Sequence, residues 1–165
     1  MRARPEPLRL YGSRSDCAAL DWTWVQQQLG ASGTYWVVAC GPGHPHPRPV
    51  WGVWTPGTGL HLSLGSPVLQ RAVELDPRVT VHLESGTDVV VVEGVVAGAG
   101  SVTAPESIEA YNLKYDWDYR VEEYGELVLV RPLKVLAWRC AGWAGRDSFQ
   151  STGSWVFDDE PTAQS

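Results

Sequence analysis

The chain has 165 residues, of which 44 % are hydrophobic and 19 % are charged, and its formal net charge is −6. These values are typical of one globular domain with a buried core. An acidic chain without a basic stripe argues against a nucleic-acid partner. No apolar run near Met1 resembles a signal peptide, and runs such as Val89–Val92 are too short to span a membrane. We therefore expect a cytoplasmic protein with no membrane partner.

Neither a metal site nor a disulfide framework is indicated. The three cysteines, Cys17, Cys40 and Cys140, form no C-x-x-C pair. His44 and His46 lie close together, but no acidic residue completes a tetrahedral ligand set with them, so we expect no metal. The nine tryptophans leave two explanations open. In the first explanation, several tryptophans line a cavity or a subunit contact. In the second, the tryptophans are scattered through the core and over the surface.

The chain divides into three parts. Residues 1–20 contain prolines and arginines with little periodicity, and we expect an N-terminal arm that is loose or ordered only against a partner subunit. Residues 21–157 form the folded domain. Residues 158–165 form a flexible, solvated C-terminal tail.

Within the folded domain, hydrophobic periodicity and turn residues predict three helices and six or seven strands. The first helix, 22–29, follows the N-cap residue Asp21, and the second begins after Ser66. The third begins at a capping box of Thr103 and Glu106 and continues to Tyr115. The strands are predicted at 34–40, 48–54, 60–64, 78–84 and 88–97, followed by two segments, 127–131 and 134–140, that are broken at Pro132. A last short strand is a candidate at 155–157, with irregular structure at 116–124 and a loop at 142–153.

Residues 47–77 have the features of a binding site for a planar, partly charged cofactor. They are predicted to form a strand, a tight turn, a second strand and a helix whose first turn follows a glycine. Trp51 and Trp54 offer a flat apolar wall, and the helix N-terminus at Ser66 offers backbone N–H groups to an anion. The same tryptophans would also serve as barrel plugs or dimer contacts, and Ser66 as a simple helix cap.

From residue 21 to residue 157 the chain resembles the pyridoxamine 5′-phosphate oxidase-like family of split β-barrels. The resemblance lies in the order and spacing of the segments DWTWVQQQL, TYWVVAC, RPVWGVW, LHLSLGS, DPRVTVHLESGTDVVVVEGV, YNLKY and VRPLKVLAW. It implies a mostly-β fold: a six-stranded split β-barrel, here with three short helices. It also implies a homodimer with its cofactor at the dimer interface. The cofactor would be FMN or, alternatively, a deazaflavin coenzyme.

The resemblance also implies where the cofactor lies. The ring would rest on the strand at 49–52, and the phosphate would lie between the end of the LHLSL strand and the following helix. Three further candidates lie outside these two segments. Arg71 is on another part of the same helix, Lys114 is a candidate cation near the cofactor, and for Trp155 the sequence leaves open whether it reaches the cofactor site of the partner subunit. The candidate cofactor-binding residues are Pro49, Val50, Trp51, Gly52, Ser63, Gly65, Ser66, Arg71, Lys114 and Trp155.

Two positions depart from the family pattern. Many members have Ser-Arg-Lys in the first turn of the second helix, where this chain has Pro67, Val68 and Leu69. Deazaflavin-type members often have Thr-Arg-Trp near the end, where this chain has Gly153 and Ser154 before the tryptophan. The usual phosphate-binding cations are therefore absent from both positions of the sequence.

The expected function is a flavin- or deazaflavin-dependent oxidoreductase that acts on an unidentified small-molecule substrate. No Ser/His/Asp or Cys/His set indicates nucleophilic catalysis, and a flavin requires none, because its ring carries the redox chemistry. Tyr111 and Tyr115 are expected in the core, with Lys114 between them near the cofactor. The alternative is a non-catalytic barrel that binds a flavin or another flat ligand, or binds nothing.

Overall fold

A computed structural model describes residues 1–8, 17–41, 43–97, 102–141 and 148–158. The described residues form ten strands and four helices. The strands are β1 (Ala3–Glu6), β2 (Ala18–Ala19), β3 (Tyr35–Cys40), β4 (Pro45–Val50), β5 (Gly52–Thr55), β6 (Gly59–Leu62), β7 (Arg78–His82), β8 (Asp88–Val96), β9 (Val128–Cys140) and β10 (Phe149–Phe157). The helices are α1 (Trp22–Ala31), α2 (Pro67–Leu75), α3 (Pro105–Tyr115) and α4 (Val121–Tyr124).

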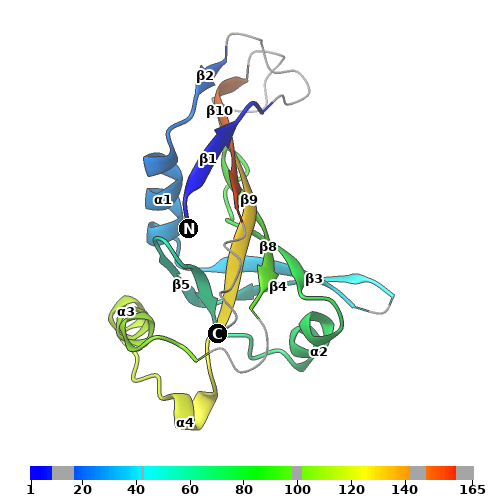
Figure 1. Ribbon diagram of the computed structural model, residues 1–165, viewed down its shortest axis with the longest axis vertical. Helices are drawn as coiled ribbons and strands as arrows, with labels where there is room; N and C mark the ends of the chain where they lie inside the picture. Colours follow the sequence, from blue (N-terminus) through cyan, green and yellow to red (C-terminus); the bar gives the residue numbers. More distant parts are fainter. Residues whose placement is uncertain (9–16, 42, 98–101, 142–147, 159–165) are drawn as a thin grey trace.

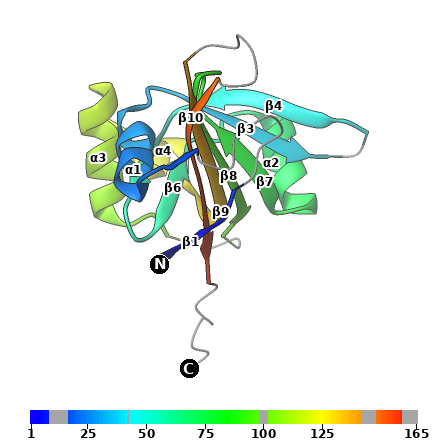
Figure 2. The same ribbon diagram turned by 90° about the horizontal axis from the view of Figure 1, so that it is seen from above.

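The sheet is continuous and almost entirely antiparallel. Its main path runs β1-β10-β9-β8-β7-β3-β4, while the β5–β6 hairpin joins through β6 to β9, and β2 pairs in parallel with β10. Helices α1 and α3 lie on one side of the central strands and α2 on the other (Figures 1 and 2). The fold is therefore mostly β, but the expected six strands and three helices are corrected to ten and four among the described residues.

The core lies on one face of the sheet, where alternate residues of neighbouring strands share a row. Val37, Val81, Val92 and Val135 are paired across β3, β7, β8 and β9, and all four are fully buried. Trp155 continues this row on β10. Successive side chains of a strand point to opposite sides, so Val79 lies on the same buried face of β7 as Val81.

A second, smaller cluster lies beneath α3. It contains Val53, Tyr111, Tyr119 and Leu127, with Ile108 and Tyr115 packed against it. This cluster fixes α3 on the outer side of the β5–β6 hairpin. The side-chain positions of Lys114 and Tyr115 follow from that placement.

Four local predictions were wrong. Ala3–Glu6 of the expected arm is strand β1, which pairs with β10, and β10 itself begins at Phe149 inside the expected loop. Residues 121–124 form α4 rather than irregular structure. Ala104 rather than Thr103 is the N-cap of α3, because the Thr103 hydroxyl accepts the Leu127 N–H at 2.9 Å.

Pro132 does not divide residues 128–140 into two strands, so the predicted break at this proline is wrong. Strand β9 continues through it, and the register shifts between Glu93 and Gly94, opposite the proline. A Cβ at Gly94 would lie 2.6 Å from the Arg131 carbonyl oxygen, so only glycine permits this approach. The β-bulge accommodates the proline without ending the strand.

Among the described residues, no helix is long and apolar enough to cross a membrane. All three cysteines are free thiols. Within the same residues, no group of three or more histidine, cysteine or acidic side chains is placed to hold a metal ion.

Candidate functional site

The chain breaks its strand pairing at Trp51. Strand β4 pairs with β3 up to Val50, and β5 pairs with β6 from Gly52 onward, so the strand predicted at 48–54 is two strands that meet at this residue. Trp51 is 45 % exposed, whereas Val50 is buried in the core. The Trp51 carbonyl accepts the Ser63 N–H at 2.9 Å. The indole is thus presented at the surface by two fixed strands.

Tyr115 supports the Trp51 indole from behind. The two rings are stacked, with centroids 4.8 Å apart and planes inclined by 6°. The Tyr115 hydroxyl accepts the Gly52 N–H at 2.9 Å, and it can donate to the carbonyl of Gly52 at 2.9 Å or of Gly33 at 3.0 Å. Tyr115 was expected in the core but is half-buried, and it holds the β4–β5 break against α3.

Lys114 lies next to this contact and binds the same glycine. Its Nζ donates to the Gly52 carbonyl at 2.9 Å and to the Tyr35 hydroxyl at 3.1 Å, and it lies over the Tyr35 and Tyr115 rings. The Tyr35 hydroxyl in turn donates to the Leu29 carbonyl at 2.6 Å. Burial lowers the pKa of Lys114 to about 8. This amine joins α3, the β4–β5 break and the end of α1.

Glycine is required at position 52 by close packing. A Cβ there would lie 2.5 Å from Leu62 Cδ2 and 2.6 Å from the His61 carbonyl oxygen. Gly52 is also the shared partner of Lys114 and Tyr115. Any side chain at this position would displace the β6 strand or the two α3 residues.

The second group of candidate residues lies at the start of α2. Ser66 is the N-cap but makes no side-chain capping hydrogen bond, and Pro67 occupies the first helical position as predicted. Gln70 Nε2 donates to the Leu64 carbonyl at 2.7 Å, which fixes the connection from β6 to the helix. Gly65 is exposed. The connection therefore runs from Ser63, bonded to Trp51, to the helix N-terminus within four residues.

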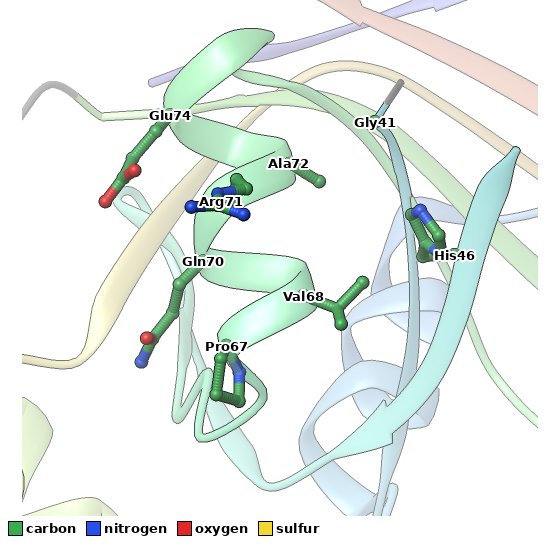
Figure 3. Close-up of a pocket in the computed structure, with 8 residues that line it drawn as sticks. All are labelled: Gly41, His46, Pro67, Val68, Gln70, Arg71, Ala72 and Glu74. Carbon is green, nitrogen blue, oxygen red and sulfur yellow. The ribbon is translucent and has the colours of Figure 1, made fainter. Parts of the chain in front are cut away.

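A groove of about 600 Å³ runs between α2 and the β3–β4 hairpin (Figure 3). Pro67, Val68, Arg71 and His46 are among the residues that line it. Figure 3 shows Arg71 on α2 and His46 on the facing strand. Gln70 and the carboxylate of Glu74 also line the groove. The Arg71 cation, the His46 ring and the helix N-terminus are the features of the groove that suit an anionic group.

Two of the noted positions lie in the interior. Leu69, where the resemblance places a phosphate-binding lysine, is completely buried in the main core. Ser154 is 2 % exposed, at the second position that is usually basic. Neither side chain is exposed to solvent or lines the α2 groove. The cation that lines the α2 groove is instead Arg71, two residues after Leu69.

The structure gathers most of the ten candidate residues into two separate places. Pro49–Gly52, Ser63 and Lys114 surround the β4–β5 break, and Gly65, Ser66 and Arg71 lie along the start of α2. Trp155 lies apart from both, 4 % exposed in the core and in contact with Trp22 at a centroid distance of 5.2 Å. Sequence reasoning missed His46 as a groove residue, because a lone histidine between prolines carries no pattern of its own.

The solved structures with similar folds include proteins whose names refer to flavins. A conserved hypothetical protein, Rv2991 from Mycobacterium tuberculosis, is 22 % identical with a TM-score of 0.57, covering 77 % of this chain and 89 % of that chain. An F420 reductase is 16 % identical with a TM-score of 0.51, covering 67 % and 94 %. An FAD-binding protein from Mesorhizobium loti is 14 % identical with a TM-score of 0.52, covering 84 % and 96 %. No protein-family model and no curated protein matches the sequence.

These similarities show the fold. The resemblance to the pyridoxamine 5′-phosphate oxidase-like split barrels is confirmed at that level. The identities are too low for the comparisons to transfer a ligand or an activity, which must be argued from the residues of this chain.

Proposed function

We propose that the protein is a flavin- or deazaflavin-dependent oxidoreductase, with FMN as the first candidate cofactor and a deazaflavin as the alternative. The observation that carries the proposal is the half-exposed Trp51 indole, held flat against Tyr115 of α3. Similar folds in proteins named as an F420 reductase and an FAD-binding protein support it. When bound, such a cofactor supplies the hydride or electron transfer.

The residues of this chain would bind and orient the cofactor. Trp51, with Pro49 and Gly52, would contact the ring, and the Gly52 backbone is already held by Lys114 and Tyr115. Arg71 and His46 would hold the anionic end in the groove, with the N–H groups near Ser66. Charge-assisted hydrogen bonds of this kind contribute about 1.5–3 kcal/mol each.

We also propose that the protein acts as a homodimer in the cytoplasm, with the cofactor at the dimer interface and a small molecule as substrate. The outer face of the sheet supports dimerisation. Its central row pairs Trp36, His82, Val91 and Leu136, all of which are half-buried, and Trp36 stacks on His82 with planes inclined by 4°. Sedimentation at micromolar concentration should show a dimer. A monomer at that concentration would refute this part.

A second candidate function is cofactor binding without catalysis. It is favoured by Leu69 and Ser154, because both usually basic positions are buried in this chain. A flavin held by fewer cations would bind more weakly and exchange more readily.

The test is titration of the purified protein with FMN and with a deazaflavin, followed by absorption and flavin fluorescence. Trp51→Ala and Arg71→Ala should each weaken binding by at least about tenfold. Leu75→Ala should leave it unchanged, because Leu75 is 62 % exposed at the far end of α2. A protein that binds neither cofactor refutes both functions. If the protein binds a cofactor but shows no turnover with any reductant, the result supports cofactor binding without catalysis.

A further inference from the structure

Six aromatic side chains form a closed ring of contacts where α3 and α4 meet the β4–β5 break. Neighbouring ring centroids are 4.8–6.4 Å apart. In order, the ring contains Trp51, Tyr115, Tyr111, Tyr119, Tyr124 and Trp117. Tyr111 and Tyr119 are buried, but Trp51, Trp117 and Tyr124 are 45 %, 48 % and 52 % exposed. We call these last three residues the aromatic corner.

The exposed aromatic side chains are grouped in the aromatic corner rather than scattered over the surface. Among the described residues, it contains every aromatic side chain that counts as exposed. The three indole and phenol rings are also in mutual contact through Trp117. Grouping of this kind on a surface marks an interaction site rather than random composition.

The rings are inclined to one another like the walls of a cage. Trp117 meets Trp51 at 79° and Tyr124 at 56°. Parallel rings would instead form a ladder for stacked bases. The segment carrying them is held in place, because the Trp117 N–H donates to the Asn112 carbonyl at 3.1 Å and the Tyr119 N–H to Asn112 Oδ1 at 2.7 Å. The walls are therefore preorganised.

The surroundings of the aromatic corner are strongly acidic. Residues 116–126 contain five carboxylates and one basic residue, Arg120. Arg120 binds Asp118 at 2.9 Å and Glu123 at 3.2 Å, so its charge is already opposed. A second cation, Lys114, lies over the buried side of the cluster, with its Nζ 5.2 Å from the Tyr115 ring centroid. The five carboxylates outnumber these two cations, so the net local charge is negative and attracts cations to the exposed ring faces.

We infer that the aromatic corner binds a small organic cation whose charge is carried by a methylated, quaternary ammonium group. Ring faces attract a weakly hydrated cation, and inclined aromatic walls suit its rounded shape. A metal ion is a poor occupant, because among the described residues the carboxylates form no ligand group. The inference goes beyond the flavin proposal and does not rest on it, because Trp117 and Tyr124 have no role there; the two sites share Trp51, so choline binding is measured on the cofactor-free protein.

The experiment compares choline with 3,3-dimethyl-1-butanol, which has the same shape without the charge. Both are titrated into the cofactor-free protein and followed by two-dimensional NMR and tryptophan fluorescence. Choline should bind saturably, and the neutral compound at least about tenfold more weakly, if the cation–ring attraction carries the affinity. Binding to the corner should shift the Trp117 indole resonance.

Variants locate the site. Trp117→Ala and Tyr124→Ala should each weaken choline binding by about 3–30-fold, and Trp117→Phe by less, because it keeps a smaller ring face. Leu113→Ala is the matched control, since Leu113 is 88 % exposed on α3 outside the corner. Circular dichroism checks that each variant is folded. If the alanine variants unfold, the choline affinity of Trp117→Phe still tests the contribution of the Trp117 ring.

Three results would overturn the inference. These are equal binding of the neutral compound, unchanged choline affinity in both Trp117 variants, and equally effective competition by sodium at matched ionic strength. Equal competition by sodium would show that choline is held only by the negative charge of the surface and not by the aromatic rings. Each result is independent of flavin binding, which is measured separately with the Trp51 and Arg71 variants.

Discussion

The pH dependence of stability should reveal the buried amine of Lys114. Its pKa is lowered to about 8 from 10.5 by burial. Between these values the folded chain has released the proton of this amine, while the unfolded chain still holds it. Stability therefore rises with pH across this window. Below about pH 8 both states are protonated and the contribution is constant.

The size of this change in stability follows from the lowering of the Lys114 pKa. At 1.36 kcal/mol per pKa unit it corresponds to about 3 kcal/mol over the full window. Because Lys114 is only half-buried, solvent screening reduces this to about 1–2 kcal/mol. The raised pKa values of Tyr111, Tyr115 and Tyr119 have the opposite sign and reduce stability above about pH 10. The measurement should therefore stop near pH 9.5, where about 1 kcal/mol is expected.

The assay is urea unfolding of the wild type, Lys114→Met and Lys114→Arg between about pH 7 and 9.5. Methionine has no proton to release, and arginine keeps its proton throughout this range. The wild type should gain about 1 kcal/mol relative to each variant as the pH rises. The variants differ in their contacts with Gly52 and Tyr35, so their absolute stabilities differ while their slopes agree. A wild-type slope equal to that of both variants would refute the assignment of Lys114 as the titrating group.

Three further changes test the rest of the structure. Tyr115→Phe keeps the ring stacked on Trp51 but leaves the Gly52 N–H without its acceptor, and thermal unfolding should show a loss of about 1–3 kcal/mol; an unchanged melting temperature would contradict the role of the hydroxyl. Leu69→Lys should lower the free energy of unfolding, measured in urea, by about 3–5 kcal/mol, because it buries an unpaired charge in the core; increased flavin affinity in a stable variant would show that this position does face the ligand. His61 is buried with no partner for either ring nitrogen among the described residues, and burial lowers its pKa. The unfolded chain therefore binds this proton first, stability is lost as the pH falls below about 6.5, and His61→Leu should reduce that loss, as measured by urea unfolding at about pH 5 and 7.

Much of the fold could be predicted because it depends on local patterns. The alternation at Val79 and Val81, the valine run of β8 and the Ser66–Pro67 start of α2 each specify an element through its neighbours in sequence. The ends of the sheet could not be predicted in this way. Ala3–Glu6 becomes a strand only because β10 presents an edge to it, more than 140 residues further along the chain.

The candidate site shows the same division. The sequence by itself singled out the Trp51–Gly52 segment, the helix N-terminus after it and Lys114 as candidates, because each has a chemical preference in a recognisable local setting or lies in a segment that resembles the family. Only the tertiary structure decided that Leu69 lies in the core, that Trp155 packs on Trp22, and that Tyr115 supports the Trp51 indole. The physical reason is that a local pattern fixes which face of an element is apolar, whereas the partner of a side chain depends on packing between segments that are distant in sequence, as α3 is from the β4–β5 break.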